Sequence, residues 1–297
     1  MPLFFMQALQ KRLFRCRIKL TGCKFLYEKS DSMYFDQHLH SHHSHDGHYS
    51  IRKMAESARS AGCCGITVTD HCNFKFEKDS DLYTPIKDSY NEFLELKESL
   101  PEDFFLGFGI EIGQGAEKVK EANEAAAWFL YDAVLGSVHS VLGKTDYCTW
   151  KGICNEPEAE MREYLLGELE IIEKTDFDIL THLTYPWRYF EKNADFPLPT
   201  DYPEITDMIF KRLIEKGRAL EVNISGLCRT PHFDYLPPMA LVKRYRELGG
   251  ELVTLGTDAH VFEQCGQHMK EGSEFLKEAG FKYLAHFRER KPTMIEL

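Results

Sequence analysis

The stretch FFLGFGIEIG (residues 104–113) has the composition of a buried β-strand. It is short, rich in aromatic and branched side chains, and carries a single charge, Glu111, near its end. Six further stretches have a similar character: YFDQHLH (34–40), CGITVTDH (64–71), DAVLGSVHS (132–140), FDILTHLTY (177–185), ALEVNIS (219–225) and LVTLGTDAH (252–260). The sequence therefore predicts seven strands.

Longer amphipathic stretches lie between these strands. Helical patterns cover residues 50–62, 116–130, 158–175, 204–217 and 238–250, and several of them end in glycine, as helix C-termini often do. Because strands and helices alternate without a linker or a break in composition, we predict a single α/β domain built on a parallel sheet. Seven units favour a closed or nearly closed (β/α) barrel, and a doubly wound open sheet is the alternative.

Composition narrows the classes of function. The chain has 297 residues, is 43% hydrophobic and carries a net charge of −11, so it can bury a core but lacks the basic surface that binds nucleic acid. We expect a small-molecule partner. Nine cysteines without a CxxC pattern indicate no disulfide framework, and a reducing cytoplasm is expected. No apolar run approaches the roughly 20 residues that cross a bilayer, and the sequence indicates no oligomeric state.

The first 32 residues are basic and apolar but lack the sustained apolar core and cleavage site of a secretory signal. The residues from Met33 onward look like an ordinary protein start. We expect Met33 to be the functional initiator, residues 1–32 to be an extension that is not native, and residues 33–297 to form the functional domain.

Six of the seven predicted strands carry acidic or histidine side chains at or near their C-terminal ends. These are His38 and His40, Asp70 and His71, Glu111, His139, His182, and Asp258 with His260. The ends of parallel strands meet on one face of a barrel, where catalytic groups lie. At any single position an ordinary core histidine is commoner than a ligand. Repetition in six strands favours a cluster, which would be costly to bury unless cations compensate it.

The spacing of these residues is typical of metal ligands. His38 and His40 are two residues apart on a strand and so share a face, and Asp258 and His260 have the same spacing. Glu111 stands in an apolar run, where a carboxylate needs a cation or hydrogen bonds, and its two oxygens can bridge two ions. Imidazole and carboxylate ligands suit Zn²⁺, Mn²⁺ or Fe²⁺, and no cysteine joins the set.

Together these motifs resemble the polymerase and histidinol phosphatase (PHP) superfamily, and within it the histidinol-phosphate phosphatase branch. The similar stretches are HLHSHHSHDG, TDH, GIEIG, GSVH, THLTYPWRY, EVNISGL and GTDAH, in the order of the family and from about Met33 to the end. The resemblance implies a distorted, TIM-like (β/α)7 barrel, the PHP fold. It also implies two to three divalent metal ions, with a trinuclear centre of nine ligands as the family pattern.

That pattern implies three groups of ligands. One ion would lie on His38, His40, Glu111 and Asp258, a second on Glu111, His139 and His182, and a third on Asp46, His71 and His260. Residues 35–50, FDQHLHSHHSHDGHYS, contain six of the thirteen histidines, a density that also occurs in disordered tracts. Four of them fall outside the family pattern and are expected at the rim or surface: His42, His43, His45 and His48.

The resemblance also suggests how the substrate is held. In the histidinol phosphatase branch, arginines after the fifth and sixth strands bind the substrate phosphate, and Arg188 and Arg229 occupy those positions here. The family often has an arginine directly after SGL, whereas Cys228 intervenes in this chain and shifts the register at Arg229. An ordinary surface arginine is the alternative at both positions.

The resulting expectation is a metal-dependent phosphomonoester hydrolase that converts L-histidinol phosphate to L-histidinol and phosphate in histidine biosynthesis. A hydroxide activated by the ions would attack phosphorus in line, with Glu111, Asp258 and His260 as catalytic residues. Asp70 either orients a ligand or caps a strand end.

Three other functions remain open. They are a PHP phosphoesterase acting on another small ester such as a nucleotide, a non-catalytic PHP module, and a barrel hydrolase with one or two metals. A non-catalytic module should have lost ligands, whereas suitable residues stand at all nine positions here.

Overall fold

A computed structural model describes residues 33–74, 81–141, 144–150, 154–190, 197–228 and 234–297. These residues belong to one compact unit, Ser32–Leu297. The proposed extension, residues 1–32, and the predicted phosphate ligand Arg229 lie outside the described residues.

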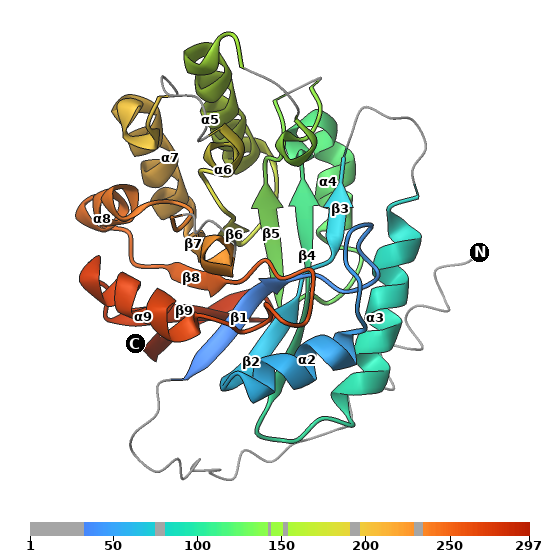
Figure 1. Cartoon of the computed structure of the whole chain (residues 1–297). Coiled ribbons are helices and arrows are strands. Elements are labelled where there is room, and N and C mark those ends of the chain that lie inside the picture. The colour runs from blue at the N-terminus through green and yellow to red at the C-terminus, as the bar shows by residue number, and fades with distance from the viewer. Residues whose placement is uncertain (1–32, 75–80, 142–143, 151–153, 191–196, 229–233) are drawn as a thin grey trace. The chain divides into compact units, whose positions relative to one another are not determined.

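The centre of the fold is a parallel sheet that curls into a nearly closed barrel (Figure 1). Its strands run in the order β1-β2-β4-β5-β6-β7-β8, and β3 also pairs with β4, so β2 and β3 are successive pieces of one strand. Their bounds are β1 Tyr34–Leu39, β2 Cys63–Val68, β3 His71–Asn73, β4 Phe105–Gly113, β5 Ala133–Ser137, β6 Ile179–Leu180, β7 Ala219–Asn223 and β8 Val253–Gly256. A parallel bridge between Leu39 and Ala259 joins the first strand to the last. The predicted (β/α)7 barrel is confirmed, and the alternative, a doubly wound open sheet, is wrong.

Helices surround the outside of the strands (Figure 1). The α-helices are α2 Ile51–Ser60, α3 Tyr83–Lys97, α4 Val119–Ala125, α5 Pro157–Lys174, α6 Trp187–Phe190, α7 Pro203–Lys216, α8 Met239–Glu247 and α9 Met269–Glu278. Short 3₁₀ turns cover η1 Gly115–Lys118, η2 Tyr147–Thr149, η3 Pro199–Asp201 and η4 Ser225–Cys228. None of the helices described here is long and apolar enough to cross a membrane.

Local sequence signals explain where several helices begin and end. The Ser50 side chain accepts a hydrogen bond from the backbone of Lys53 and caps α2. Helix α7 begins at Pro203 and is followed by Gly217 at φ 66°, a conformation that glycine adopts without strain. The helix expected over 116–130 is shorter, because η1 precedes it and it ends at Ala125.

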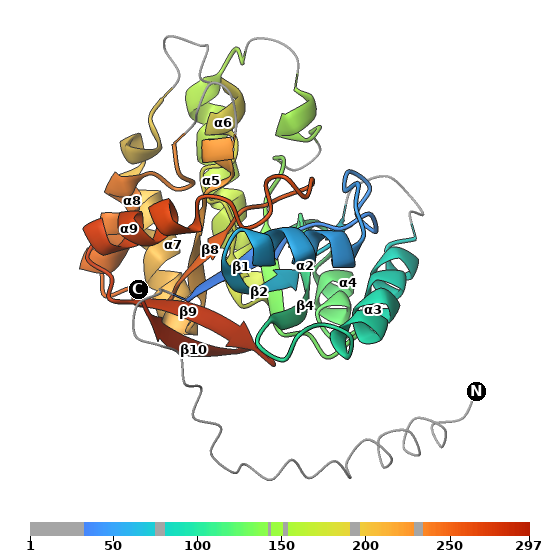
Figure 2. The same ribbon diagram turned by 60° about the horizontal axis from the view of Figure 1, so that its bottom comes forward.

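An antiparallel hairpin, β9 Tyr283–Arg288 and β10 Lys291–Glu296, lies below the barrel (Figure 2). Its Ala285 and Phe287 pack into a small apolar cluster with residues of β5, β6 and β7. Gln37, inside β1, donates to the Ala285 carbonyl at 2.7 Å and accepts from the Phe287 amide at 2.9 Å. The hairpin therefore covers the end of the barrel opposite to the carboxyl ends of the strands.

Candidate metal centre

The nine predicted ligands meet at the carboxyl ends of the strands. His38 lies in β1, His71 in β3 and Glu111 in β4, where strand pairing places the last two side by side. The others stand in loops that directly follow β1, β5, β6 and β8: His40 and Asp46, His139, His182, and Asp258 with His260. Six of the nine also line a cavity of about 270 Å³: Asp46, His71, His139, His182, Asp258 and His260.

Glu111 is the centre of this cluster and has no solvent exposure. Its Oε1 lies 3.1 Å from His182 Nε2 and 3.3 Å from His139 Nε2. Its Oε2 lies 2.7 Å from His71 Nδ1, yet neither of these two atoms makes a hydrogen bond. A buried carboxylate oxygen without a donor is costly, and a cation between the two atoms would remove that cost.

Around Glu111, imidazole nitrogens face one another in pairs. The Nε2 atoms of His38 and His40 are 3.2 Å apart, and Asp258 Oδ1 lies 3.6 and 3.4 Å from them. The Nε2 atoms of His139 and His182 are 3.3 Å apart. Each pair can share only one proton, whereas a metal ion accepts a lone pair from both rings.

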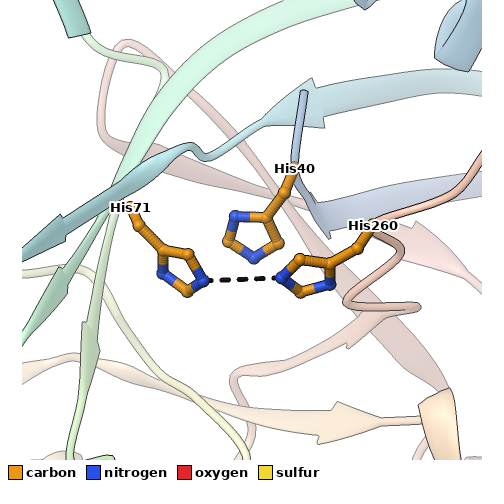
Figure 3. Close-up of side chains that lie close together, drawn as sticks. All are labelled: His40, His71 and His260. Atoms are coloured by element: carbon orange, nitrogen blue, oxygen red, sulfur yellow. Dashed lines mark hydrogen bonds between the residues drawn. The ribbon is translucent and has the colours of Figure 1, made fainter. Parts of the chain in front are cut away.

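A third pair, His71 and His260, lies beside His40 (Figure 3). The Nε2 atoms of His71 and His260 are 3.5 Å apart, and Asp46 Oδ2 lies 3.6 Å from one and 3.4 Å from the other. The His40 ring is stacked against both, with ring centroids 4.1 and 4.2 Å away. The structure thus brings together the residues of each group that the family pattern implies.

Electrostatics favours ionised carboxylates here. Burial raises the pKa of Glu111, but His71, His139 and His38 outweigh it and hold that pKa well below its usual range. Burial also raises the pKa of Asp258, but His38, His40 and His260 together outweigh it, so the net shift of that pKa is downward.

The imidazoles divide into two kinds. Burial lowers the pKa of His40, and the neighbouring His71 and His260 lower it further. Burial also lowers the pKa of His71, but Glu111 and Asp46 outweigh it and raise that pKa to about 10. Ionised carboxylates, orphaned oxygens and paired nitrogens are the donor set of a hard or borderline divalent cation, so the residues present fit such ions.

Asp70 does not join the cluster but holds the loop that follows β1. It accepts hydrogen bonds from the Ser41 amide and hydroxyl, and from the hydroxyls of Ser44 and Ser89. Ser44 Oγ in turn lies 3.2 Å from Nδ1 of His40. Of the two roles expected for Asp70, the structure favours orienting a ligand.

Arg188 lies beside the metal cluster and lines the same cavity. Its side chain comes from α6 and is only 5% exposed. Nη2 donates to Ser225 Oγ at 2.5 Å and to Asn223 Oδ1 at 3.3 Å, and Nη1 lies 3.7 Å from Asp258 Oδ2. It is therefore not an ordinary surface arginine.

Three of the remaining histidines of the opening cluster lie outside the cavity lining: His42, His43 and His48. His43 pairs with Glu92 at 2.9 Å, and His42 lies 3.8 Å from the same oxygen. His45 does line the cavity, with its ring centroid 5.2 Å from that of His71.

A further carboxylate, which the strand-end pattern did not indicate, is Glu221 in β7, and it is 1% exposed. It contacts His38 at 2.7 Å. The signal was present, because Glu221 is a lone charge in a strand-like stretch, as Glu111 is.

Comparison with known proteins agrees with this geometry. The PHP domain model matches residues 36–225. A probable histidinol-phosphatase of Thermotoga maritima is 31% identical over 251 residues, which cover 84% of this chain and 94% of that protein. The histidinol-phosphatase of Lactococcus lactis is 28% identical over 261 residues, covering 86% and 95%.

Solved structures give the same result. The crystal structure of histidinol phosphate phosphatase from Lactococcus lactis, complexed with zinc, L-histidinol and phosphate, has a TM-score of 0.76 at 27% identity and covers 89% of this chain and 100% of that one. A Listeria monocytogenes protein, described as a putative histidinol phosphatase, is 16% identical and shares the fold with a TM-score of 0.69, covering 80% of this chain and 99% of that one. The matched model spans more than half of the sequence and contains seven of the nine predicted ligands, Glu111 among them, so this chain belongs to the PHP domain family.

Proposed function

We propose that this protein is a histidinol-phosphatase, which hydrolyses L-histidinol phosphate to L-histidinol and phosphate in histidine biosynthesis. One observation carries the proposal: a buried cluster of histidines and carboxylates and a buried arginine open into the same cavity. It is supported by the likeness to the Lactococcus lactis enzyme, whose structure holds zinc, L-histidinol and phosphate.

We assign the metal ligands to two to three sites, the first two of which share Glu111. His38, His40 and Asp258 would hold one ion with Glu111, and His139 and His182 a second; Asp46, His71 and His260 would hold the third. Zinc is the ion in the similar structure, and manganese or iron suit the same donors. When bound, such ions supply Lewis acidity toward a water molecule and toward the phosphoryl oxygens.

The residues of the chain itself provide the positioning. Arg188 presents a guanidinium to the cavity and would bind the phosphoryl oxygens, while Ser225 and Asn223 fix its direction. Asp258 would connect the two halves of the site, because one of its oxygens faces His38 and His40 and the other faces Arg188. A phosphate placed between the arginine and the metal ligands would be oriented before reaction.

Phosphate release from L-histidinol phosphate tests the proposal. The metal-replete protein should be assayed beside nucleoside monophosphates and sugar phosphates, with metal content measured on the same sample. We expect a strong preference for L-histidinol phosphate with two to three metals per chain. A preference for another ester would support a metal-dependent phosphatase but would contradict the assignment of L-histidinol phosphate as its substrate.

A further inference from the structure

A buried carboxylate that is not among the nine ligands contacts two of them. We propose that Glu221 is a positioning residue, which presents His38 and His182 to the metal ions of the proposed phosphatase site. The proposal rests on that proposed function only in assigning ions to this cluster.

The first contact orients the His38 ring. Nδ1 of His38 donates to Glu221 Oε1 at 2.7 Å, and neither side chain is more than 1% exposed. A proton held on Nδ1 leaves the Nε2 lone pair free, and Nε2 is the atom that faces His40, Glu111 and Asp258. Glu221 therefore selects the tautomer and the ring direction that a metal ligand requires.

The second contact fixes the backbone that carries His182. The amide of His182 donates to Glu221 Oε2 at 2.8 Å. His182 has a φ of 24°, in the left-handed region that is unfavourable for a residue other than glycine. A charge-assisted hydrogen bond at the strained residue offsets part of this cost and holds the His182 side chain toward Glu111.

The neighbouring strand leaves space for this arrangement. Gly256 of β8 pairs with Asn223 of β7, and a Cβ at Gly256 would come within 2.3 Å of Glu221 Oε1 and 2.5 Å of His38 Cβ. Any larger residue would separate the carboxylate from the imidazole. Glycine at this position thus permits the contact between β7 and β1.

Strand β7 extends the same role along one face. Asn223 follows Glu221 by two residues, donates to its Oε2 at 3.3 Å, and accepts from Arg188. Alternate residues of a strand share a face. Strand β7 therefore orients two metal ligands through Glu221 and the proposed phosphate-binding arginine through Asn223.

Zinc affinity of the Glu221→Gln variant tests the proposal. Glutamine keeps one acceptor and turns an N–H toward either the His38 ring or the His182 amide, so one of the two contacts is lost. We expect zinc affinity, measured by chelator competition on the full chain without substrate, to fall about 10–100-fold. Turnover should fall at limiting zinc and recover in excess zinc, with the KM for ester nearly unchanged because Arg188 is intact.

Glu168→Gln is the matched control. Glu168 lies in α5, is equally buried, and pairs with Tyr164 rather than with the cluster. Its variant should keep native zinc affinity whatever its thermal stability. If Glu221→Gln also bound zinc as tightly as the native protein and only lowered Tm, Glu221 would be a structural residue and the proposal would fail.

The Glu221→Asp variant keeps the negative charge on a shorter side chain. It provides the test of the proposal if the Glu221→Gln variant does not fold. Its zinc affinity should lie between those of the native protein and the glutamine variant. Weaker binding than in the glutamine variant would show that side-chain length, not the carboxylate, matters. Because zinc binding is measured without ester, a failure of the substrate assignment would leave this result unaffected.

Discussion

At the scale of single residues, the site combines groups that are expensive to bury. Arg188 has an Nε atom without a hydrogen-bond partner in the structure, although its Nη2 atom is firmly held. Glu111 likewise has an orphaned oxygen. Unsatisfied polar atoms of this kind are rare in protein interiors and mark positions where a ligand completes the hydrogen bonding or coordination.

Replacing Arg188 by alanine should raise the KM for the phosphate ester about 10–100-fold, since a hydrogen bond between charged groups contributes about 1.5–3 kcal/mol. Metal content should not change. Steady-state kinetics and metal analysis on one preparation measure both. Arg212→Ala is the control, because Arg212 is an exposed residue paired with Glu173. An unaltered KM in Arg188→Ala would place the arginine outside the substrate site.

At the scale of elements, the β9–β10 hairpin introduces a buried histidine far from the metal cluster. His286 stacks on Phe35 with ring centroids 4.1 Å apart and meets the edge of Phe105 at 4.7 Å. Burial, together with the nearby Arg288, lowers the pKa of His286 to about 4. The neutral ring is therefore the form that fits under the barrel.

His286 should make stability depend on pH. Its folded pKa is below the usual value of 6.5, so its contribution is complete above pH 6.5 and is lost as pH falls toward 4. The loss amounts to about 3 kcal/mol over that range. The phenylalanine in His286→Phe cannot bind a proton. The free energy of unfolding of this variant minus that of the native protein should therefore increase when the pH is lowered from 7 to 5. Denaturant unfolding at both values measures it, and an equal difference at the two pH values would contradict the assignment.

At the scale of the whole molecule, the proposed metal ligands come from both sides of the seam where the barrel closes. His38 lies in the first strand and Asp258 directly follows the last one. Among the described residues, one bridge and a few backbone hydrogen bonds join the sheet there. Ions shared by ligands from both sides would connect this seam. Binding to the folded state alone stabilises a protein by mass action.

Adding zinc to chelator-treated protein should therefore raise Tm. Free zinc at 100 times the dissociation constant of one site adds about 2.7 kcal/mol to the free energy of unfolding. For a domain of this size, that corresponds to an increase in Tm of roughly 5–10 °C. His139→Ala, which lacks one proposed ligand, should show a smaller rise, and His42→Ala the full one. Thermal unfolding with and without zinc checks this, and an equal rise in both variants would exclude His139 as a ligand.

The sequence by itself determined the seven strands and the residues at their ends. Those features depend on local patterns: apolar strand stretches, two-residue spacing, and motifs of the family such as HLH and GTDAH. It did not indicate α3, α9 or the hairpin, whose positions depend on packing against distant elements. The helix expected over 116–130 ended early, since Trp128 and Phe129 pack instead against Tyr83.

Only the tertiary structure decided how the ligands are held. Glu221 and His38 are separated by 183 positions in the chain, and they meet because the barrel curls until β8, the neighbour of β7, lies beside β1. The direction of Arg188 likewise depends on Asn223 and Ser225, which arrive with β7. A sequence motif specifies which donors are available, whereas closure of the sheet determines which donor faces which, because contacts across the barrel have no local periodicity.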